Sequence, residues 1–149
     1  MRTLINVLAT FGGVGYFPIA PGTITSLILV IAYKVVFYRL SPPVYISIAL
    51  GIYLVGVWSS SAYAARAQKE DPRTVVIDEV LGQWIALMTM PPVWGYVLMS
   101  FVLFRFFDIA KPLFIRKAET FRAGWGIMLD DILAGIFANI ILNIYLMVK

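Results

Sequence analysis

The hydrophobic positions of this chain gather into long runs that are separated by short charged segments. The run over residues 44–65 carries no charge and exceeds the roughly 20 residues that a helix needs to cross about 30 Å of hydrocarbon. The runs over residues 24–40 and 132–148 are two further candidate spans, and Lys34 in the first can extend toward a headgroup. A buried core helix is the alternative for any one of them.

Two shorter apolar runs, residues 80–90 and 93–107, flank Pro91 and Pro92, which are expected to break a helix. At 1.5 Å per residue each run reaches only roughly 16 to 22 Å, so the region is either a short helical hairpin or one kinked span. The hairpin places almost all basic residues on the side of the N-terminus, in agreement with the positive-inside tendency, and it is the interpretation we adopt. These basic residues are Arg66, Lys69, Arg73, Arg105, Lys111, Arg116, Lys117 and Arg122, and only Arg39 and Lys149 fall on the other side.

The predicted architecture is therefore all-α: a multi-pass helical membrane protein with about three full spans plus a short hairpin broken at Pro91-Pro92. Residues 1–149 form a single domain, because no internal repeat or linker is apparent. Asn139 and Asn143, one helical turn apart, are expected to face another helix, where their amides find partners. The glycines are expected to let helices approach closely at Gly82, Gly126 and Gly135.

The amino-acid composition limits the chemistry that this chain can perform. The chain is 61% hydrophobic and 13% charged, against about 25% charged in a typical soluble domain. It contains no cysteine and no histidine, which excludes disulfides, thiol nucleophiles, imidazole bases and zinc or iron sites that need such ligands. The net charge is +4 and no basic run is interleaved with aromatic residues, so nucleic acid is not an expected partner. The groups that remain available for catalysis or binding are carboxylates, lysines, arginines, hydroxyls and backbone amides.

In the adopted topology every acidic residue lies on the side of the N-terminus, at or near a helix end. They are Glu70, Asp71, Asp78, Glu79, Asp108, Glu119, Asp130 and Asp131. Glu70 is expected in a solvated turn. The two adjacent pairs, 78–79 and 130–131, are instead embedded among apolar residues, where a carboxylate at the centre of a span costs roughly 2.5 to 3.5 kcal/mol. Such groups normally pair with a cation or belong to a functional site.

Two interpretations of these carboxylates stay open at this point. In the first they form ion pairs, Asp108 with Lys111 or Arg105 and Asp78 with Arg73. In the second they bind a divalent cation, and an oxygen-only ligand set suits Mg²⁺ or Mn²⁺ better than zinc. Adjacent helical residues point about 100° apart, so at most one member of each pair is expected to face a given neighbour.

A glycine- and proline-rich stretch, residues 8–27, offers a second kind of site. Its glycines and prolines exclude regular helix over residues 12–22, after which Thr23 or Thr25 is expected to cap the first span. Glycine-rich backbone that leads into a helix N-terminus can present N–H groups to a phosphate. A loop that re-enters the membrane surface needs similar residues.

Four segments together resemble one known family. They are "ATFGGVGYFPIAPGT", "DPRTVVIDEVLGQWIAL", "FRFFDIAKP" and "GWGIMLDDILAG". In this order, from Ala9 to Gly135, they are similar to the phosphatidylglycerophosphatase A family. The resemblance implies a Mg²⁺-dependent bacterial membrane phosphatase that converts phosphatidylglycerophosphate, a phospholipid substrate in the membrane, into phosphatidylglycerol. The chain departs from the family pattern at Thr25, Phe114 and Ala123, and none of these departures removes a charged group.

The resemblance and the residues converge on one hypothesis. We expect four metal ligands: Asp78, Glu79, Asp130 and Asp131. Asp108 is expected to complete the catalytic group or to orient Lys111 toward phosphate, and Mg²⁺ to neutralise the phosphomonoester and activate water. The expected substrate contacts are Lys111, Arg105, Thr23, Gly12, Gly13 and Gly15. The site is expected at the cytoplasmic face of the inner membrane.

Several alternatives remain at the level of the sequence. An Asp nucleophile that forms an aspartyl-phosphate is one, although the Asp-x-Asp pattern common in such phosphatases is absent. A small transporter or channel subunit would use the carboxylates as an ion path through the bilayer. A structural or assembly protein would use them as ion-paired helix ends, and a phosphatase could act on another lipid phosphomonoester. Oligomeric state is not predicted.

Overall fold

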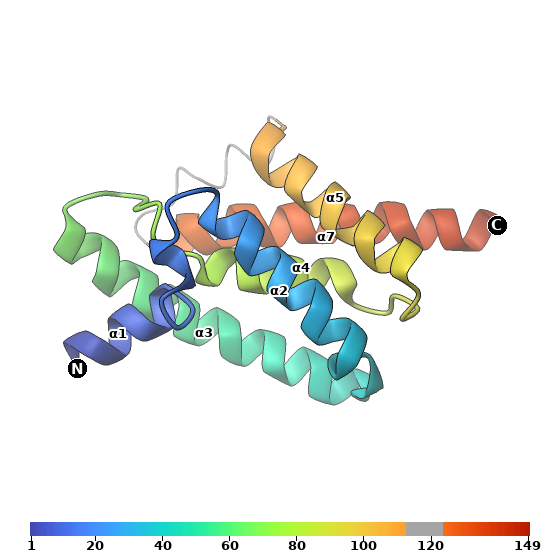
Figure 1. The fold of residues 1–149 in the computed structure, drawn as a ribbon, viewed down its shortest axis with the longest axis horizontal. Helices are drawn as coiled ribbons and strands as arrows, with labels where there is room; N and C mark the ends of the chain where they lie inside the picture. Colours follow the sequence, from blue (N-terminus) through green and yellow to red (C-terminus); the bar gives the residue numbers. More distant parts are fainter. Residues whose placement is uncertain (113–123) are drawn as a thin grey trace.

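The computed structural model describes residues 1–112 and 124–149, and this part of the chain is helical throughout, with no strand (Figure 1). Its α-helices are α1 (Arg2–Ala9), α2 (Pro21–Val35), α3 (Pro42–Ala67), α4 (Ile77–Leu87), α5 (Trp94–Ala110) and α7 (Gly124–Val148), with short 3₁₀ turns η1 (Val14–Tyr16) and η2 (Phe37–Arg39). The all-α prediction is confirmed. Predictions that concern Phe114, Arg116, Lys117, Glu119, Arg122 and Ala123 lie outside the described residues.

The long helices alternate in direction, so that the N-terminal ends of α2, α4 and α7 meet the C-terminal ends of α3 and α5. Several contacts define this meeting point: Gly22 of α2 touches Glu79 of α4, and Gly124 N donates to Ser61 Oγ of α3 at 3.0 Å. We call it the acidic end, because it holds Asp78 and Asp131. The opposite end holds the turn between α4 and α5, residues 88–93.

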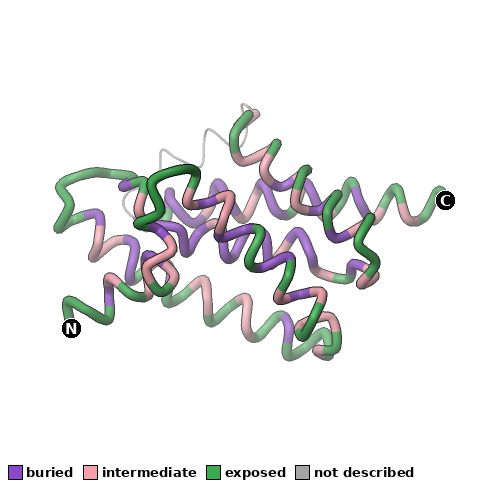
Figure 2. Tube along the Cα trace, in the orientation of Figure 1, coloured by how far each residue is buried: buried purple, intermediate pink, exposed green. Residues whose placement is uncertain are grey.

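Helix α4 is the centre of the bundle. Nine of its eleven residues are buried, and it packs against α2, α3, α5 and α7 (Figure 2). A Cβ added at Gly135 would lie 2.3 Å from Gly82 O, and one added at Gly82 would lie 2.4 Å from Phe104 Cε2. The predicted close approach of helices at Gly82 and Gly135 is therefore confirmed, and it brings the backbones of α4 and α7 into contact.

The hairpin broken at Pro91-Pro92 is also confirmed, since α4 ends at Leu87 and α5 begins at Trp94. Its turn is held by side chains from two other helices. Tyr33 OH donates to Met90 O at 2.5 Å, and Asn139 Nδ2 donates to Met88 O at 2.6 Å. Asn143 Nδ2 donates to Asn139 Oδ1 of the same helix at 3.0 Å, so the predicted contact with another helix is confirmed for Asn139, which also donates to Ala86 O of α4 at 3.3 Å.

Lys34 differs from its expected role. Instead of extending to a headgroup, its ammonium donates to Pro92 O and lies 5.7 Å from the centroid of the Trp94 ring. A partly buried carbonyl of the turn and an aromatic face together provide the partners that water would otherwise supply.

Two helices are long and apolar enough to cross a membrane, α3 with a mean hydropathy of 1.6 and α7 with 1.9. Only 22% and 28% of their most apolar 18-residue windows is buried, which leaves most of that apolar surface on the outside. This indicates association with a membrane. The third predicted span, residues 24–40, is not confirmed: α2 has 15 residues and ends at Val35, because the chain leaves helical geometry at Val36.

Candidate functional site

Three carboxylates meet at the acidic end. Asp78 and Glu79 come from the first turn of α4 and Asp131 from the second turn of α7, and one oxygen of each lies within 4.8 Å of the other two. Asp78 is 9% exposed and Asp131 is 3% exposed. Asp78 Oδ1, Glu79 Oε2 and Asp131 Oδ2 are buried and have no hydrogen-bond partner among the residues that the structure describes. Burying charged oxygens in this way costs free energy unless a cation compensates them.

The convergence follows from local geometry at the crossing of α4 and α7. A Cβ at Gly82 would lie 2.7 Å from Asp131 O, so the backbone of α7 passes directly over the first turns of α4. Acidic residues in the first turn of α4 are favoured by the helix dipole. The expectation that only one of two adjacent carboxylates faces a given neighbour is wrong for Asp78 and Glu79, because both contribute an oxygen to this group.

The two carboxyl groups at the start of α4 have raised pKa values. Burial, followed by the neighbouring Glu79 charge, raises the pKa of Asp78 well above its ordinary value. Burial also raises the pKa of Glu79, to about 8. Both shifts have the same main cause, removal of the charged form from water. A cation placed among these oxygens would favour the ionised forms.

Glu79 is held against the start of α2. A Cβ added at Gly22 would lie 1.9 Å from Glu79 Oε1, so any side chain at this position would displace the Glu79 carboxylate. Sequence reasoning missed this role of Gly22. The signal was a glycine inside the first turn of a helix, where it lowers helix propensity and needs another reason.

The predicted cap of α2 is wrong. Neither Thr23 nor Thr25 caps it: the N-cap is Ala20, in the left-handed region with φ 46°, and it makes no side-chain cap. Pro21 follows at the first helical position, where its fixed φ is favourable. Thr23 lies in the first turn, and the amides of Gly22 and Thr23 have no acceptor within the helix.

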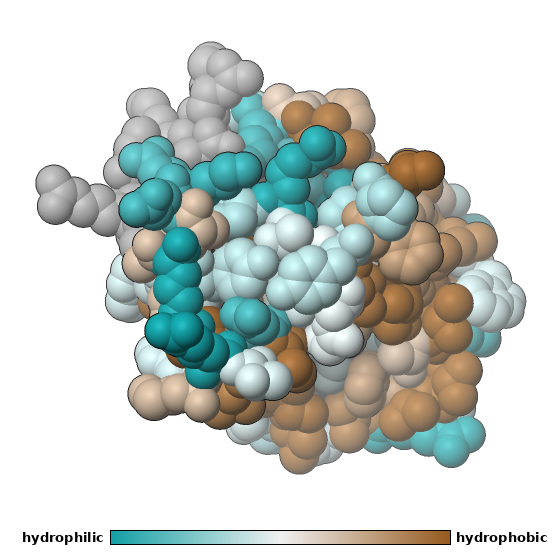
Figure 3. Space-filling view, turned by 60° about the vertical axis from the view of Figure 1, so that its left-hand side comes forward, coloured by the Kyte–Doolittle hydropathy of each residue, from teal (hydrophilic) through white to brown (hydrophobic). Residues whose placement is uncertain are grey.

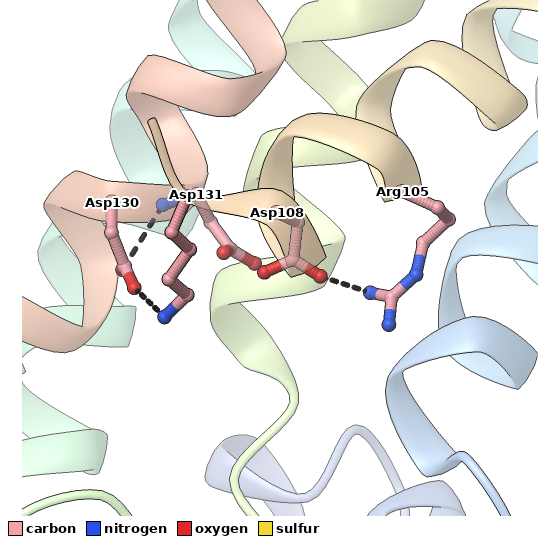
Figure 4. A network of polar contacts seen from close by, with 5 residues as sticks. Arg105, Asp108, Asp130 and Asp131 are labelled. Carbon is pink, nitrogen blue, oxygen red and sulfur yellow. Dashed lines mark hydrogen bonds and ion pairs between the residues drawn. The ribbon is translucent and has the colours of Figure 1, made fainter. Parts of the chain in front are cut away.

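Asp130 is separated from its neighbour Asp131. Its Oδ2 lies 2.6 Å from Lys111 Nζ, and its Oδ1 accepts a hydrogen bond from Asp131 N at 3.0 Å (Figure 4). Lys111 is the C-cap of α5, with φ 40° in the left-handed region. The four predicted metal ligands therefore divide into a group of three and a separate ion pair that contains Asp130.

Asp108 forms the other ion pair of the site. Its Oδ2 lies 2.6 Å from Arg105 Nη1, one turn earlier on α5. Figure 4 shows the carboxylates of Asp108 and Asp131 pointing toward one another, so Asp108 lies between Arg105 and Asp131. Arg105 Nε has no partner among the described residues. The Asp108–Arg105 pair predicted as an alternative is present, whereas no ion pair joins Asp78 to Arg73 in residues 1–112.

The glycine-rich loop does not offer the predicted phosphate cradle. The amides in question already donate within the loop: Gly12 N to Val7 O at 2.8 Å, Gly13 N to Thr10 Oγ1 at 3.1 Å and Gly15 N to Thr10 O at 2.9 Å. Gly12 and Gly13 have φ values of 69° and 99°, which favour glycine. A Cβ at Gly15 would lie 1.9 Å from Thr74 O, so this loop packs on the segment that leads into α4.

Comparisons with known proteins give a family and several similar proteins. A family model described as Phosphatidylglycerophosphatase A matches residues 7–146, a range that includes all five acidic residues of the site. Proteins named phosphatidylglycerophosphatase A from Haemophilus influenzae and Escherichia coli are similar to this chain. The first is 36% identical and aligns over 92% of this chain and 85% of its own length, and the second is 35% identical over 89% and 78%.

A Bacteroides thetaiotaomicron protein, provisionally named as a phosphatidylinositol-3-phosphatase, is 36% identical over 93% of this chain and 91% of its own length. No solved structure matches the chain.

Proposed function

We propose, because this chain belongs to the phosphatidylglycerophosphatase A family, that it hydrolyses the terminal phosphate of phosphatidylglycerophosphate and leaves phosphatidylglycerol. Family membership makes the chain a phosphoric monoester hydrolase. One observation carries the assignment to this site: Asp78, Glu79 and Asp131 each place one carboxylate oxygen within 4.8 Å of the others, next to two ion-paired cationic side chains. Each of the three also has a buried oxygen without a hydrogen-bond partner among the described residues.

The residues of this group fit Mg²⁺. All three donors are carboxylate oxygens, which hard divalent cations prefer, and the chain has no histidine or cysteine to attract zinc. Two oxygens bound to one Mg²⁺ at about 2.1 Å lie at most about 4.2 Å apart. In octahedral geometry at least two of the three oxygen pairs would lie about 3.0 Å apart, so binding would draw the three carboxylates, now within 4.8 Å of one another, closer together. Bound there, the ion would supply a Lewis acid for the phosphoryl oxygens and acidify a water.

The cationic residues are the proposed phosphate contacts. Lys111 and Arg105 are each held in place by a carboxylate, at 2.6 Å from Asp130 and from Asp108 respectively. Phosphoryl transfer depends chiefly on positioning and on stabilisation of charge, which two oriented cations provide. Asp108 stands outside the group of three and faces Asp131, so it is the carboxylate that we assign to orient the attacking water.

The proposed location follows from the same arrangement. With α3 and α7 across the bilayer, the acidic end lies at headgroup level, where the phosphate of a lipid substrate would be found while its acyl chains stay in the leaflet. Basic residues at this end include Arg66, Lys111 and Arg105, whereas Arg39 lies at the other end of α2. The positive-inside tendency then places the acidic end on the cytoplasmic side of the inner membrane.

The decisive experiment measures phosphate released from a panel of lipid phosphomonoesters by the purified protein, with and without Mg²⁺. We expect release from phosphatidylglycerophosphate that requires Mg²⁺ and stops on chelation. The name of the Bacteroides relative supports a second candidate substrate, phosphatidylinositol 3-phosphate, which belongs in the same panel. Faster release from that lipid would replace our substrate, and release that continues unchanged in chelator would overturn the metal assignment.

The transporter alternative predicts acidic groups distributed along the depth of the bundle. Among the described residues, the buried carboxylates gather at one end instead, and polar residues deeper in the spans, such as Asn139, are hydrogen-bonded to backbone carbonyls. We expect no ion flux when the protein is reconstituted in liposomes. A Mg²⁺ or proton current that depends on Asp131 would favour the transporter.

A further inference from the structure

A polar cavity, distinct from the group of carboxylates at the acidic end, lies between α1 and the C-terminal end of α3. It has a volume of about 430 Å³ and is lined by Arg2 and Asn6 of α1 and by Tyr63, Arg66 and Ala67 of α3. This volume falls within the usual range of small-molecule sites, about 300 to 1,000 Å³. None of the acidic residues of the candidate active site lines it, so the two sites are separate.

The lining of this cavity is suited to an anion. Among the described residues it carries two guanidinium groups, an amide and a phenol, and no carboxylate. Neither Arg2 nor Arg66 forms an ion pair with a described residue, in contrast to Arg105 and Lys111 at the active site. Guanidinium groups bind phosphate oxygens through paired N–H donors. Two of them facing one cavity without a carboxylate leave a local positive charge that an anionic ligand would neutralise.

The cavity is also connected to the acidic end. Thr74 Oγ1 donates to Tyr63 OH at 2.9 Å, and Val76 N donates to Ala9 O at 2.9 Å. Residues 74–76 lead directly into α4, so the helices that line the cavity hold the segment that positions Asp78 and Glu79. Figure 3, which brings this side of the molecule forward, shows hydrophilic side chains gathered over it and hydrophobic ones mainly over the body behind. The cavity therefore opens at the polar end of the bundle.

We propose that this cavity binds the phosphodiester headgroup of an anionic phospholipid, separately from the lipid that is hydrolysed. Arg2 and Arg66 contact the phosphate, while Asn6 and Tyr63 donate to the remaining headgroup oxygens. A cavity at headgroup level beside α3, an apolar helix long enough to span the bilayer, suits a ligand whose acyl chains remain in the leaflet. A headgroup bound in the cavity would contact both α1 and α3. It would thereby stabilise residues 74–76, the segment that leads into α4.

The test is a titration of short-chain phosphatidylglycerol into the purified protein in an uncharged detergent, followed by the rise in Tm. At about 1 kcal/mol per basic residue near an anionic surface, we expect about fivefold weaker binding for Arg2→Gln or Arg66→Gln and about thirtyfold for both together. Arg66→Lys, which keeps the charge, should recover most of the affinity. Phosphatidylglycerol carries no phosphomonoester, so the readout does not depend on turnover.

The matched control is the double variant Lys69→Gln/Arg73→Gln. It removes the same charge from the same end of the molecule, at exposed positions that do not line the cavity, and it should retain wild-type lipid binding. An equal loss in this control would mean diffuse attraction and overturn the site. An equal Tm rise with inorganic phosphate alone would overturn the lipid assignment in favour of a free anion.

Asp131→Asn separates this inference from the proposed function. It should abolish hydrolysis and leave phosphatidylglycerol binding unchanged. A loss of binding in Asp131→Asn would place the lipid in the active site and overturn the separate cavity, whereas a failure of the phosphatase assay alone would leave the cavity result standing.

Discussion

The two ends of the helix bundle both bury polar groups, and they treat them in opposite ways. At the opposite end, Tyr33, Lys34 and Asn139 donate to backbone carbonyls of the turn between α4 and α5. At the acidic end, Asp78 and Asp131 keep buried oxygens without a partner among the described residues. Hydrogen-bonded polar groups contribute to stability, whereas unpartnered buried charges cost free energy. The first end is accounted for by folding, and the second fits the cation site that we propose.

The largest effect on activity is expected from Asp131→Asn at the acidic end. The change removes one oxygen ligand and one buried charge, so we expect phosphate release to fall by more than about 100-fold, beyond the effect typical of residues that only support a metal ligand. The metal-free protein should not be less stable, because an unpartnered charge has been removed. Phosphate release and Tm, each with and without Mg²⁺, measure both effects. Wild-type activity in this variant would end the metal-site interpretation.

Gly22→Ala tests the wall of the same site without touching a carboxylate. The new methyl group would lie 1.9 Å from Glu79 Oε1 and must displace it, and a displacement of about 1 Å can cost roughly 100-fold in rate. The matched control is Gly51→Ala, since a Cβ there has nothing within 4 Å. We expect the control to keep its activity. If both variants behave alike in the phosphate-release assay, Glu79 does not need its observed position.

Asp130→Asn should lower phosphate release less than Asp131→Asn does. Asp130 binds Lys111 rather than joining the group of three, so its loss removes this ion pair without removing a proposed metal ligand. We expect a loss of about tenfold, seen mainly in KM for the lipid, with Mg²⁺-dependent stabilisation retained. Kinetics over a range of lipid and Mg²⁺ concentrations separate these quantities. A greater dependence on Mg²⁺ would instead return Asp130 to the metal ligands.

The smallest effect on activity is expected at the opposite end, from Asn139→Ala. This change removes donors to Ala86 O and Met88 O and should lower the free energy of unfolding by about 1 kcal/mol. Activity per folded molecule should remain near wild type, because the residue lies far along α7 from Asp131. Denaturant unfolding and the phosphate-release assay provide the two measurements. A large loss of activity in a folded variant would mean that the two ends are coupled.

The fold was predictable to the extent that it follows from runs of apolar residues. The long helices α3 and α7 and the break at Pro91-Pro92 are properties of local sequence, and all are confirmed. The third span was not predictable in the same way. Residues 24–40 are mainly apolar, yet helix α2 ends at Val35, and hydropathy alone does not report where the backbone leaves helical geometry.

The site was predictable in its residue types and only partly in its arrangement. A carboxylate pair embedded in an apolar run is visible in sequence, and so are the cations near it. Which aspartate of 130–131 joins Glu79 depends on the rotation of α7 about its axis, which the Gly82–Gly135 contact sets. The glycine loop was misjudged because its amides find acceptors inside the loop, a pairing that only the folded backbone reveals.

The amino-acid sequence by itself determined the family, the helical class and the absence of histidine and cysteine chemistry, because each depends on which residues are present and in what order. The tertiary structure alone decided that Asp78, Glu79 and Asp131 share one space while Asp130 turns to Lys111. The physical reason is that a ligand group is defined by distances of a few ångströms between atoms on different helices, and those distances are set by how closely α4 and α7 pack.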